Sequence, residues 1–154
     1  MIPLIPFTWW TISSKLSAEE AYMRLLPRLE QRSWFRWGLG QYHFPFEGSA
    51  SQKGFNINRV IRYRNSFLPM LYGNFTMNRD QLKIQVVAMI HPFVLVFLIS
   101  ILGTMVGNIR NESDSGNALR NLASIALPVY IIIQALFVYE LYKAKRFLNE
   151  TFQS

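Results

Sequence analysis

The chain has 154 residues, no cysteine, and a formal net charge of +7 from sixteen Lys and Arg against nine Asp and Glu. This length allows one domain, or a small domain with an anchor, and the lack of cysteine excludes disulfides, thiolate catalysis and cysteine-ligated metals. Eleven basic residues precede position 87 and three follow Tyr139, whereas two lie in between. Such an excess at both ends is typical of a membrane protein with cytoplasmic termini. Because no zinc, helix-turn-helix or RNA-binding motif accompanies the charge, we predict no nucleic-acid partner.

The first fourteen residues are apolar, but they lack the basic start of a signal peptide and are too short to cross a membrane. They include Trp9 and Trp10. Tryptophan prefers the headgroup boundary, so this segment is either an interfacial anchor or a strand or loop packed on the domain.

A capping box follows at Ser17-Ala-Glu-Glu20, where the serine hydroxyl can accept from a backbone amide and Glu20 can reach back to the amide of Ser17. It predicts the start of an amphipathic helix, which Pro27 is expected to kink or divide. Arginines then recur at every fourth position with two tryptophans nearby. They form either a face lying on anionic lipid or an ordinary solvated helix face. With the first two tryptophans, the candidate membrane-surface contacts are Trp9, Trp10, Arg24, Arg28, Arg32, Trp34, Arg36 and Trp37.

From residue 41 the apolar pattern alternates, which predicts strands at residues 42–47, 55–63, 67–77 and 82–89. The connections are short, so we expect an antiparallel meander with the helix from Ser17 across one face. A polar corner at Tyr63, Arg64, Asn65 and Ser66 is either a turn that satisfies its own backbone or a binding corner.

Two motifs carry a resemblance. The run from Phe55 to Pro69 reads F-x-I-x-R-x-I-x-Y-R-N-S-F-x-P, and His91-Pro92-Phe93 opens an apolar helix. In this, residues 44 to 100 resemble a group of small bacterial predicted membrane proteins of unknown function. The resemblance implies a bacterial membrane location, in the plasma (inner) membrane or an internal one, and no activity.

The stretch from Ile84 to Val106 has no charged residue, and residues 122–142 form a second apolar stretch. We therefore expect an α+β membrane protein with an N-terminal amphipathic helix, a small antiparallel β-meander and a C-terminal two-helix transmembrane hairpin. In this prediction residues 1–90 form a cytoplasmic, membrane-proximal domain. Residues 91–147 form the hairpin, with spans at about 92–108 and 122–142, and residues 148–154 are a tail.

Within the second apolar stretch, the small residues Ala123 and Ala126 and the polar Gln134 suit close packing against a partner helix. No nucleotide-binding, metalloprotease or serine-hydrolase motif occurs, so we predict no catalytic, cofactor or metal site. The expected function is a non-catalytic accessory subunit that lies in a lipid bilayer and docks on a larger membrane complex or on itself. The alternative is a component of a membrane enzyme or transporter that uses His91 and the arginine-rich region at the membrane surface.

Overall fold

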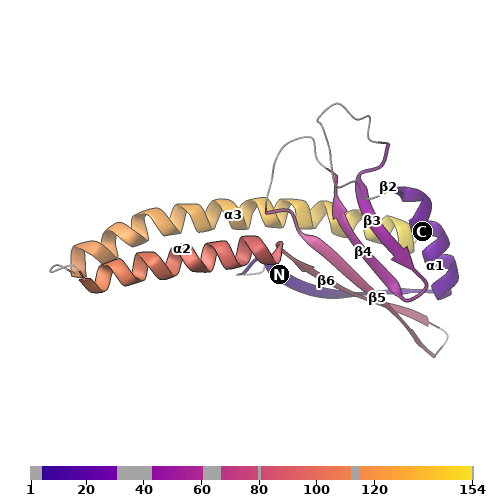
Figure 1. The fold of residues 1–154 in the computed structure, drawn as a ribbon. Coiled ribbons are helices and arrows are strands. Elements are labelled where there is room, and N and C mark those ends of the chain that lie inside the picture. The colour runs from indigo at the N-terminus through magenta and orange to yellow at the C-terminus, as the bar shows by residue number, and fades with distance from the viewer. Residues whose placement is uncertain (1–4, 31–42, 61–66, 80, 112–114, 154) are drawn as a thin grey trace.

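The computed structural model describes residues 5–30, 43–60, 67–79, 81–111 and 115–153. In these ranges the chain forms one sheet and three α-helices (Figure 1). The elements in chain order are β1 (Phe7–Ser14), α1 (Ala18–Leu25), a short 3₁₀ helix η1 (Leu26–Arg28), β2 (Leu29–Glu30), β3 (Phe46–Ser51), β4 (Gly54–Arg59), β5 (Met70–Asn78), β6 (Gln81–Met89), α2 (Pro92–Asn111) and α3 (Ser115–Phe152).

The sheet has six strands in the order β1-β6-β5-β4-β3-β2. The short β2 lies parallel to β3, and every other neighbouring pair is antiparallel. Strand β1 pairs with β6 along its whole length, from Phe7 opposite Met89 to Ser14 opposite Leu82. The N-terminal segment is therefore a strand of the sheet, one of the two alternatives that its sequence left open.

The predicted fold class is wrong. Instead of an N-terminal helix, a small meander and a two-helix transmembrane hairpin, the chain forms a six-stranded mixed sheet with three helices. In the part that the structure describes, a single helix, α3, contains a stretch long and apolar enough to cross a membrane. The sequence prediction missed β2 and left β1 as one of two alternatives. It also ended the last helix too early, because that helix continues through the polar residues that follow its apolar stretch.

The expected turn at residues 48–54 is much shorter than predicted. Strands β3 and β4 are joined through Gln52 and Lys53 alone, with Ser51 paired to Gly54. Gly48 has φ of 146° and Gly54 has φ of 152°, a region that side chains disfavour. A Cβ atom at either glycine would also lie about 2 Å from a backbone oxygen of the next strand, 2.1 Å and 2.0 Å respectively. Two residues that signal a turn in the sequence thus serve here as strand positions with close backbone contact.

The core lies between one face of the sheet, called the inner face below, and the C-terminal half of α3. Alternate residues of the strands are buried there, including Ile12, Ile57 and Ile84. From α3 a stripe at helical spacing packs against them. Its buried members are Phe137, Leu141, Ala144, Leu148 and Phe152.

Helix α1 begins at the predicted capping box. The Ser17 hydroxyl accepts from the Glu20 amide at 3.1 Å, and the Glu20 carboxylate accepts from the Ser17 amide at 2.7 Å. Ala21 and Leu25 are fully buried. We expected this helix to cover the sheet, but α3 occupies most of the inner face and α1 packs beside the C-terminal end of α3 (Figure 1).

Candidate membrane-facing surface

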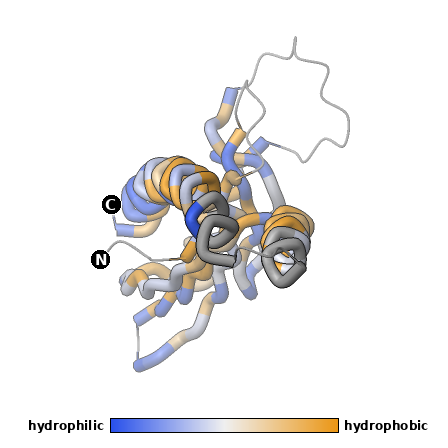
Figure 2. The backbone as a smooth tube through the Cα atoms, turned by 90° about the vertical axis from the view of Figure 1, so that its left-hand side faces the viewer, coloured by the Kyte–Doolittle hydropathy of each residue, from blue (hydrophilic) through white to orange (hydrophobic). Residues whose placement is uncertain are grey.

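Two helices project from one end of the sheet, side by side (Figure 1). They are α2 and the first half of α3, residues 115–132, and we call them together the helical arm. At 1.5 Å per residue, the apolar stretch of α2, Pro92–Thr104, extends about 20 Å, less than the roughly 30 Å of a bilayer's hydrocarbon core. Figure 2, viewed from the free end of the arm, shows that hydrophobic residues predominate on α2.

The arm exposes large apolar side chains that nothing in the described structure covers. Phe93 is 81% exposed, Phe97 64% and Leu127 60%. The others that are at least 39% exposed are Leu95, Val96, Ile99, Ile101, Leu102, Val106, Ile125, Val129, Ile131 and Ile132. A soluble monomer seldom presents so large a contiguous apolar surface, which instead marks contact with a membrane or another protein.

By length and composition, one stretch in the described chain could cross a membrane, Ala123–Phe152 in α3, while α2 contributes the shorter apolar stretch Pro92–Thr104. The second half of the α3 stretch packs on the sheet, as a core helix of a soluble protein does. Its first half differs, since side chains from Ala123 to Ile132 are exposed apart from partly covered Ala126. Among the α3 residues whose side chains the structure describes, Ile133, 7% exposed, is the first buried one, and it marks the base of the arm.

Aromatic and basic side chains gather on α3 beyond this base. Tyr139 and Tyr142 are exposed, and the Lys143 ammonium lies 3.8 Å from the centroid of the Tyr139 ring. At helical rise these residues lie about 9 to 15 Å past Ile133. Tyrosine and lysine are enriched where membrane proteins leave the hydrocarbon core, because their polar ends can reach the headgroups.

His91 opens α2. Its carbonyl accepts from the amides of Val94 and Leu95, its Nδ1 accepts from the amide of Phe93 at 3.3 Å, and its ring stacks on the Phe93 ring. These bonds satisfy amides of the first turn, which is the work of a helix cap. The alternative role in chemistry at the membrane surface gains no support from this arrangement.

A buried ion pair fastens α3 to the sheet just beyond the arm. The guanidinium of Arg59 on β4 donates to the carboxylate of Glu140, whose side chain is 1% exposed. The pair was not predicted, because Arg59 and Glu140 are 81 positions apart in the chain. A signal was present, since Arg59 continues the alternation of Phe55 and Ile57 and so points to the inner face.

The two N-terminal tryptophans lie on opposite faces of β1. Trp9 is 72% exposed on the outer face. Trp10 packs against the core on the inner face, with the Lys145 ammonium 4.8 Å from the centroid of its ring. Only Trp9 is therefore placed to contact a membrane surface.

The arginine series is only partly described. Arg24 is exposed on α1, and Arg28 donates to the Thr151 hydroxyl at 3.2 Å, which ties η1 to the end of α3. The remaining predicted surface contacts and the predicted polar corner lie outside the described residues. These are Arg32, Trp34, Arg36 and Trp37, and Tyr63, Arg64, Asn65 and Ser66.

The predicted partner-helix contacts lie on α3. Ala123 is exposed, whereas Ala126 and Gln134 are half-buried. Gln134 also borders a shallow apolar hollow on the helix surface, lined by Tyr130, Ile131, Gln134, Ala135 and Val138. A small residue at the floor of such a hollow allows another helix to approach closely.

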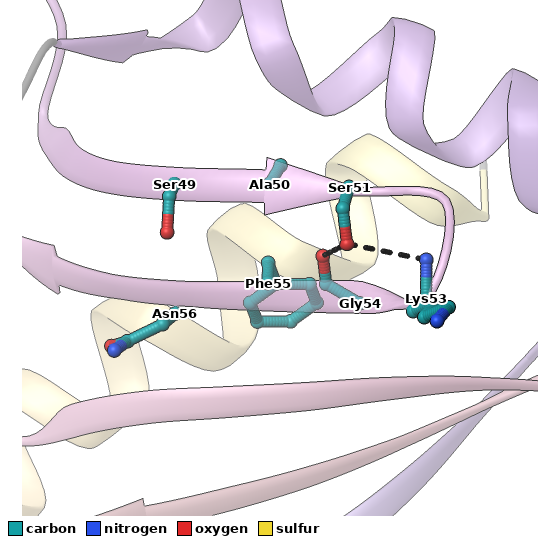
Figure 3. A pocket seen from close by; sticks show the side chains of 7 residues that line it. All are labelled: Ser49, Ala50, Ser51, Lys53, Gly54, Phe55 and Asn56. Carbon is teal, nitrogen blue, oxygen red and sulfur yellow. Dashed lines mark hydrogen bonds between the residues drawn. The ribbon is translucent and has the colours of Figure 1, made fainter.

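A second shallow hollow lies at the turn between β3 and β4 (Figure 3). Its polar groups are engaged in the turn, because the Ser51 hydroxyl donates to the Gly54 carbonyl and accepts from the Lys53 amide, both at 3.3 Å. Ser49, Asn56 and the core residue Phe55, whose ring stacks on that of Phe152, also border it. The hollow brings together no acid, base or nucleophile with the geometry of a catalytic site.

Among the described residues, no group of three or more His, Asp and Glu side chains is close enough to hold a metal ion. No protein-family model, no curated protein and no solved structure matches the chain.

Proposed function

We propose that this chain is a non-catalytic integral membrane protein, anchored by the helical arm, whose sheet domain and arm together dock on a partner membrane protein. The observation that carries the proposal is the apolar surface of the arm, which ends where α3 meets the sheet at Ile133. In water that surface would drive aggregation, whereas in hydrocarbon it costs nothing.

The charge distribution supports a sheet domain that lies on the cytoplasmic side of a bacterial plasma membrane. Both β1 and the end of α3 belong to this domain, so both ends of the described chain lie on the same side of the arm. Fourteen of the sixteen Lys and Arg residues fall outside the segment from residue 87 to Tyr139. Positive residues near a membrane are retained on the cytoplasmic side, and the resemblance to small bacterial membrane proteins points the same way.

Membrane anchoring is tested by washing isolated membranes with alkaline carbonate. We expect the whole chain to stay in the pellet, because burial of the arm does not depend on surface charge. A variant with Phe97→Glu and Leu127→Glu, both on the exposed arm, should move to the supernatant or be degraded. The matched control, Thr11→Glu and Gln85→Glu on the polar part of the sheet, should pellet normally. Release of the unmodified chain by carbonate would refute the anchor.

Docking is tested at Ala126 and Gln134 of α3, of which Gln134 lines the hollow. Replacement of Gln134 by Leu together with Ala126 by Phe should release co-purifying proteins, because a bulky ring replaces a small residue where a helix would approach. Ile125→Phe with Ile132→Leu, on the side of α3 away from Gln134, is the matched control and should retain them. Retention of every partner and of the native mass by the first variant would refute this docking surface.

A further inference from the structure

The outer face of the sheet changes from apolar to polar along its strands, and the strand register shows this change row by row. Side chains on this face that stand opposite each other on β1, β6 and β5 form successive rows. The first row is Phe7, Met89 and Met70, and the second is Trp9, Val87 and Tyr72. The third is Thr11, Gln85 and Asn74, and the fourth is Ser13, Lys83 and Thr76.

The first two rows are apolar or aromatic, and the next two are polar. The side chains of the first two rows also contact one another. The rings of Phe7 and Trp9 lie 5.8 Å apart, and the Tyr72 hydroxyl lies 3.8 Å from the Met70 sulfur. Trp9, Phe7 and Tyr72 are at least 36% exposed. Most apolar side chains of the strands lie on the packed inner face, so exposed aromatic residues on the outer face are unexpected. We call these six residues the outer-face patch.

The patch lies at the end of the sheet nearest the arm. Met89 is the last residue of β6, and α2 begins at Pro92, so the first row stands at the base of the arm. Strands β1 and β6 extend away from the arm on the far side of this row (Figure 1). The two rows are about 7 Å apart along the strands. The headgroup layer on one side of a bilayer is about 5 to 8 Å deep, so the patch matches that layer in depth and position.

The composition of the patch also fits lipid. Tryptophan and tyrosine settle at the boundary between hydrocarbon and water because their rings are apolar and their edges hydrogen-bond. The polar third row begins where the headgroups would give way to water. On the inner-face side, Tyr139 and Lys143 of α3 also lie beyond the arm base, about 9 to 15 Å past Ile133 along the helix.

We infer that the outer-face patch rests in the headgroup layer of the membrane that holds the arm, so that the sheet itself contacts lipid. The inference rests on the proposed anchoring by the arm. It adds a second contact that fixes the depth of the sheet and its rotation about the arm.

The absence of native cysteine allows a depth ladder on one strand. Met89, Val87, Gln85 and Lys83 follow each other on the outer face of β6, one per row. Each is replaced by Cys in the full chain, which is then reconstituted in nanodiscs of phosphatidylcholine with phosphatidylglycerol. Spin labels at these sites report collision with oxygen, which concentrates in lipid, and with a water-soluble nickel chelate.

We expect labels at Met89→Cys and Val87→Cys to lose accessibility to the nickel chelate and gain it to oxygen, with a reversal at Gln85→Cys. Equal exposure of all four labels to the chelate would overturn the inference. Protection of the first two labels in native membranes but not in pure-lipid nanodiscs would also overturn it, since a protein would then be the occupant.

A label at Leu127→Cys on the arm separates failure of this inference from failure of the anchor. If it lies in lipid while the ladder is entirely in water, the patch alone is refuted. If it is in water too, the proposed anchoring fails as well.

Discussion

The two halves of α3 both carry many large apolar side chains, but these side chains have opposite surroundings. From residue 133 onward one stripe of the helix is buried against the sheet and the other sides face outward, as in a water-soluble protein. From Ala123 to Ile132 the large apolar side chains are exposed around the helix. The comparison teaches that apolar content alone does not identify a membrane segment. What distinguishes the halves is whether the protein itself supplies the apolar neighbour.

The largest expected effect follows from removing one partner of the buried ion pair in the sheet-bound half. Arg59→Met should lower the free energy of unfolding by about 3 to 5 kcal/mol, because it removes a guanidinium that bonds to the buried Glu140 carboxylate. Denaturant unfolding in detergent micelles, followed by circular dichroism, measures the loss.

The double variant Arg59→Met with Glu140→Leu should recover most of that stability, since no charge then remains to be neutralised. A single variant that loses less than about 1 kcal/mol, the size typical of an exposed pair, would contradict the buried environment assigned to Glu140.

A leucine-to-alanine substitution in each half compares the two directly. Leu148→Ala, fully buried on the sheet, should cost about 2 to 5 kcal/mol because a cavity remains. Leu127→Ala on the arm, 60% exposed, should change the unfolding free energy by less than about 0.5 kcal/mol. The same micellar unfolding experiment measures both, and equal losses would show that the arm packs as tightly as the sheet-bound half.

These expectations concern features that the sequence revealed unequally. The capping box at Ser17, strands β5 and β6 and the apolar character of the arm could be predicted, because each depends on local pattern. The second half of α3 could not be assigned, because the stripe from Phe137 to Phe152 satisfies a sheet's apolar face as well as hydrocarbon. Only the distant strands decide which one it meets.

The outer strands were hidden for a similar reason. Strand β1 and its partner β6 are far apart along the chain, with the other four strands between them, and no local sequence signal links them. The candidate membrane-facing surface could be predicted only in part. Tryptophan at position 9 suggested an interface, but its association with Tyr72 and Met89 depends on register, and Trp10 turned out to face the core.

Glycine substitutions sharpen the comparison at smaller scale. A Cβ at Gly73 would lie 2.2 Å from ring atoms of Phe55, which is itself held between Phe75 and Phe152. Gly73→Ala should therefore cost about 1 to 3 kcal/mol. At Gly103 on the arm nothing lies within 4 Å of an added Cβ, so Gly103→Ala should stabilise the helix by about 0.5 to 1 kcal/mol. Thermal unfolding in micelles should shift in opposite directions, and a shift in the same direction would contradict one environment.

The smallest expected effect concerns α1, which buries one side and exposes the other to water. It lies outside both halves of α3 and serves as a reference for them. The hydrogen bonds from the Ser17 amide and hydroxyl hold the pKa of Glu20 below its ordinary value. The ionised carboxylate therefore stabilises the fold above the unfolded pKa of about 4.3, and this contribution is lost as the pH falls through the lower folded pKa. The native chain should therefore be slightly more stable than Glu20→Gln above this pH range, and the difference in stability should disappear as the pH falls through it. Hydrogen exchange in α1 would measure the difference. A constant difference at every pH would contradict it.

The bond from the Ser14 hydroxyl to the Phe152 carbonyl, 2.6 Å long, joins residues 138 positions apart and has a consequence for biosynthesis. Strand β1 leaves the ribosome long before β6, its partner, and the inner face of the sheet stays uncovered until the last twenty residues are made. The arm is synthesised before those residues. Closure of the core therefore comes last, and until then the nascent sheet has its apolar side open. A chain with such distant pairings folds slowly and is vulnerable to aggregation meanwhile. Early capture of α2 by the insertion machinery would shorten that exposure.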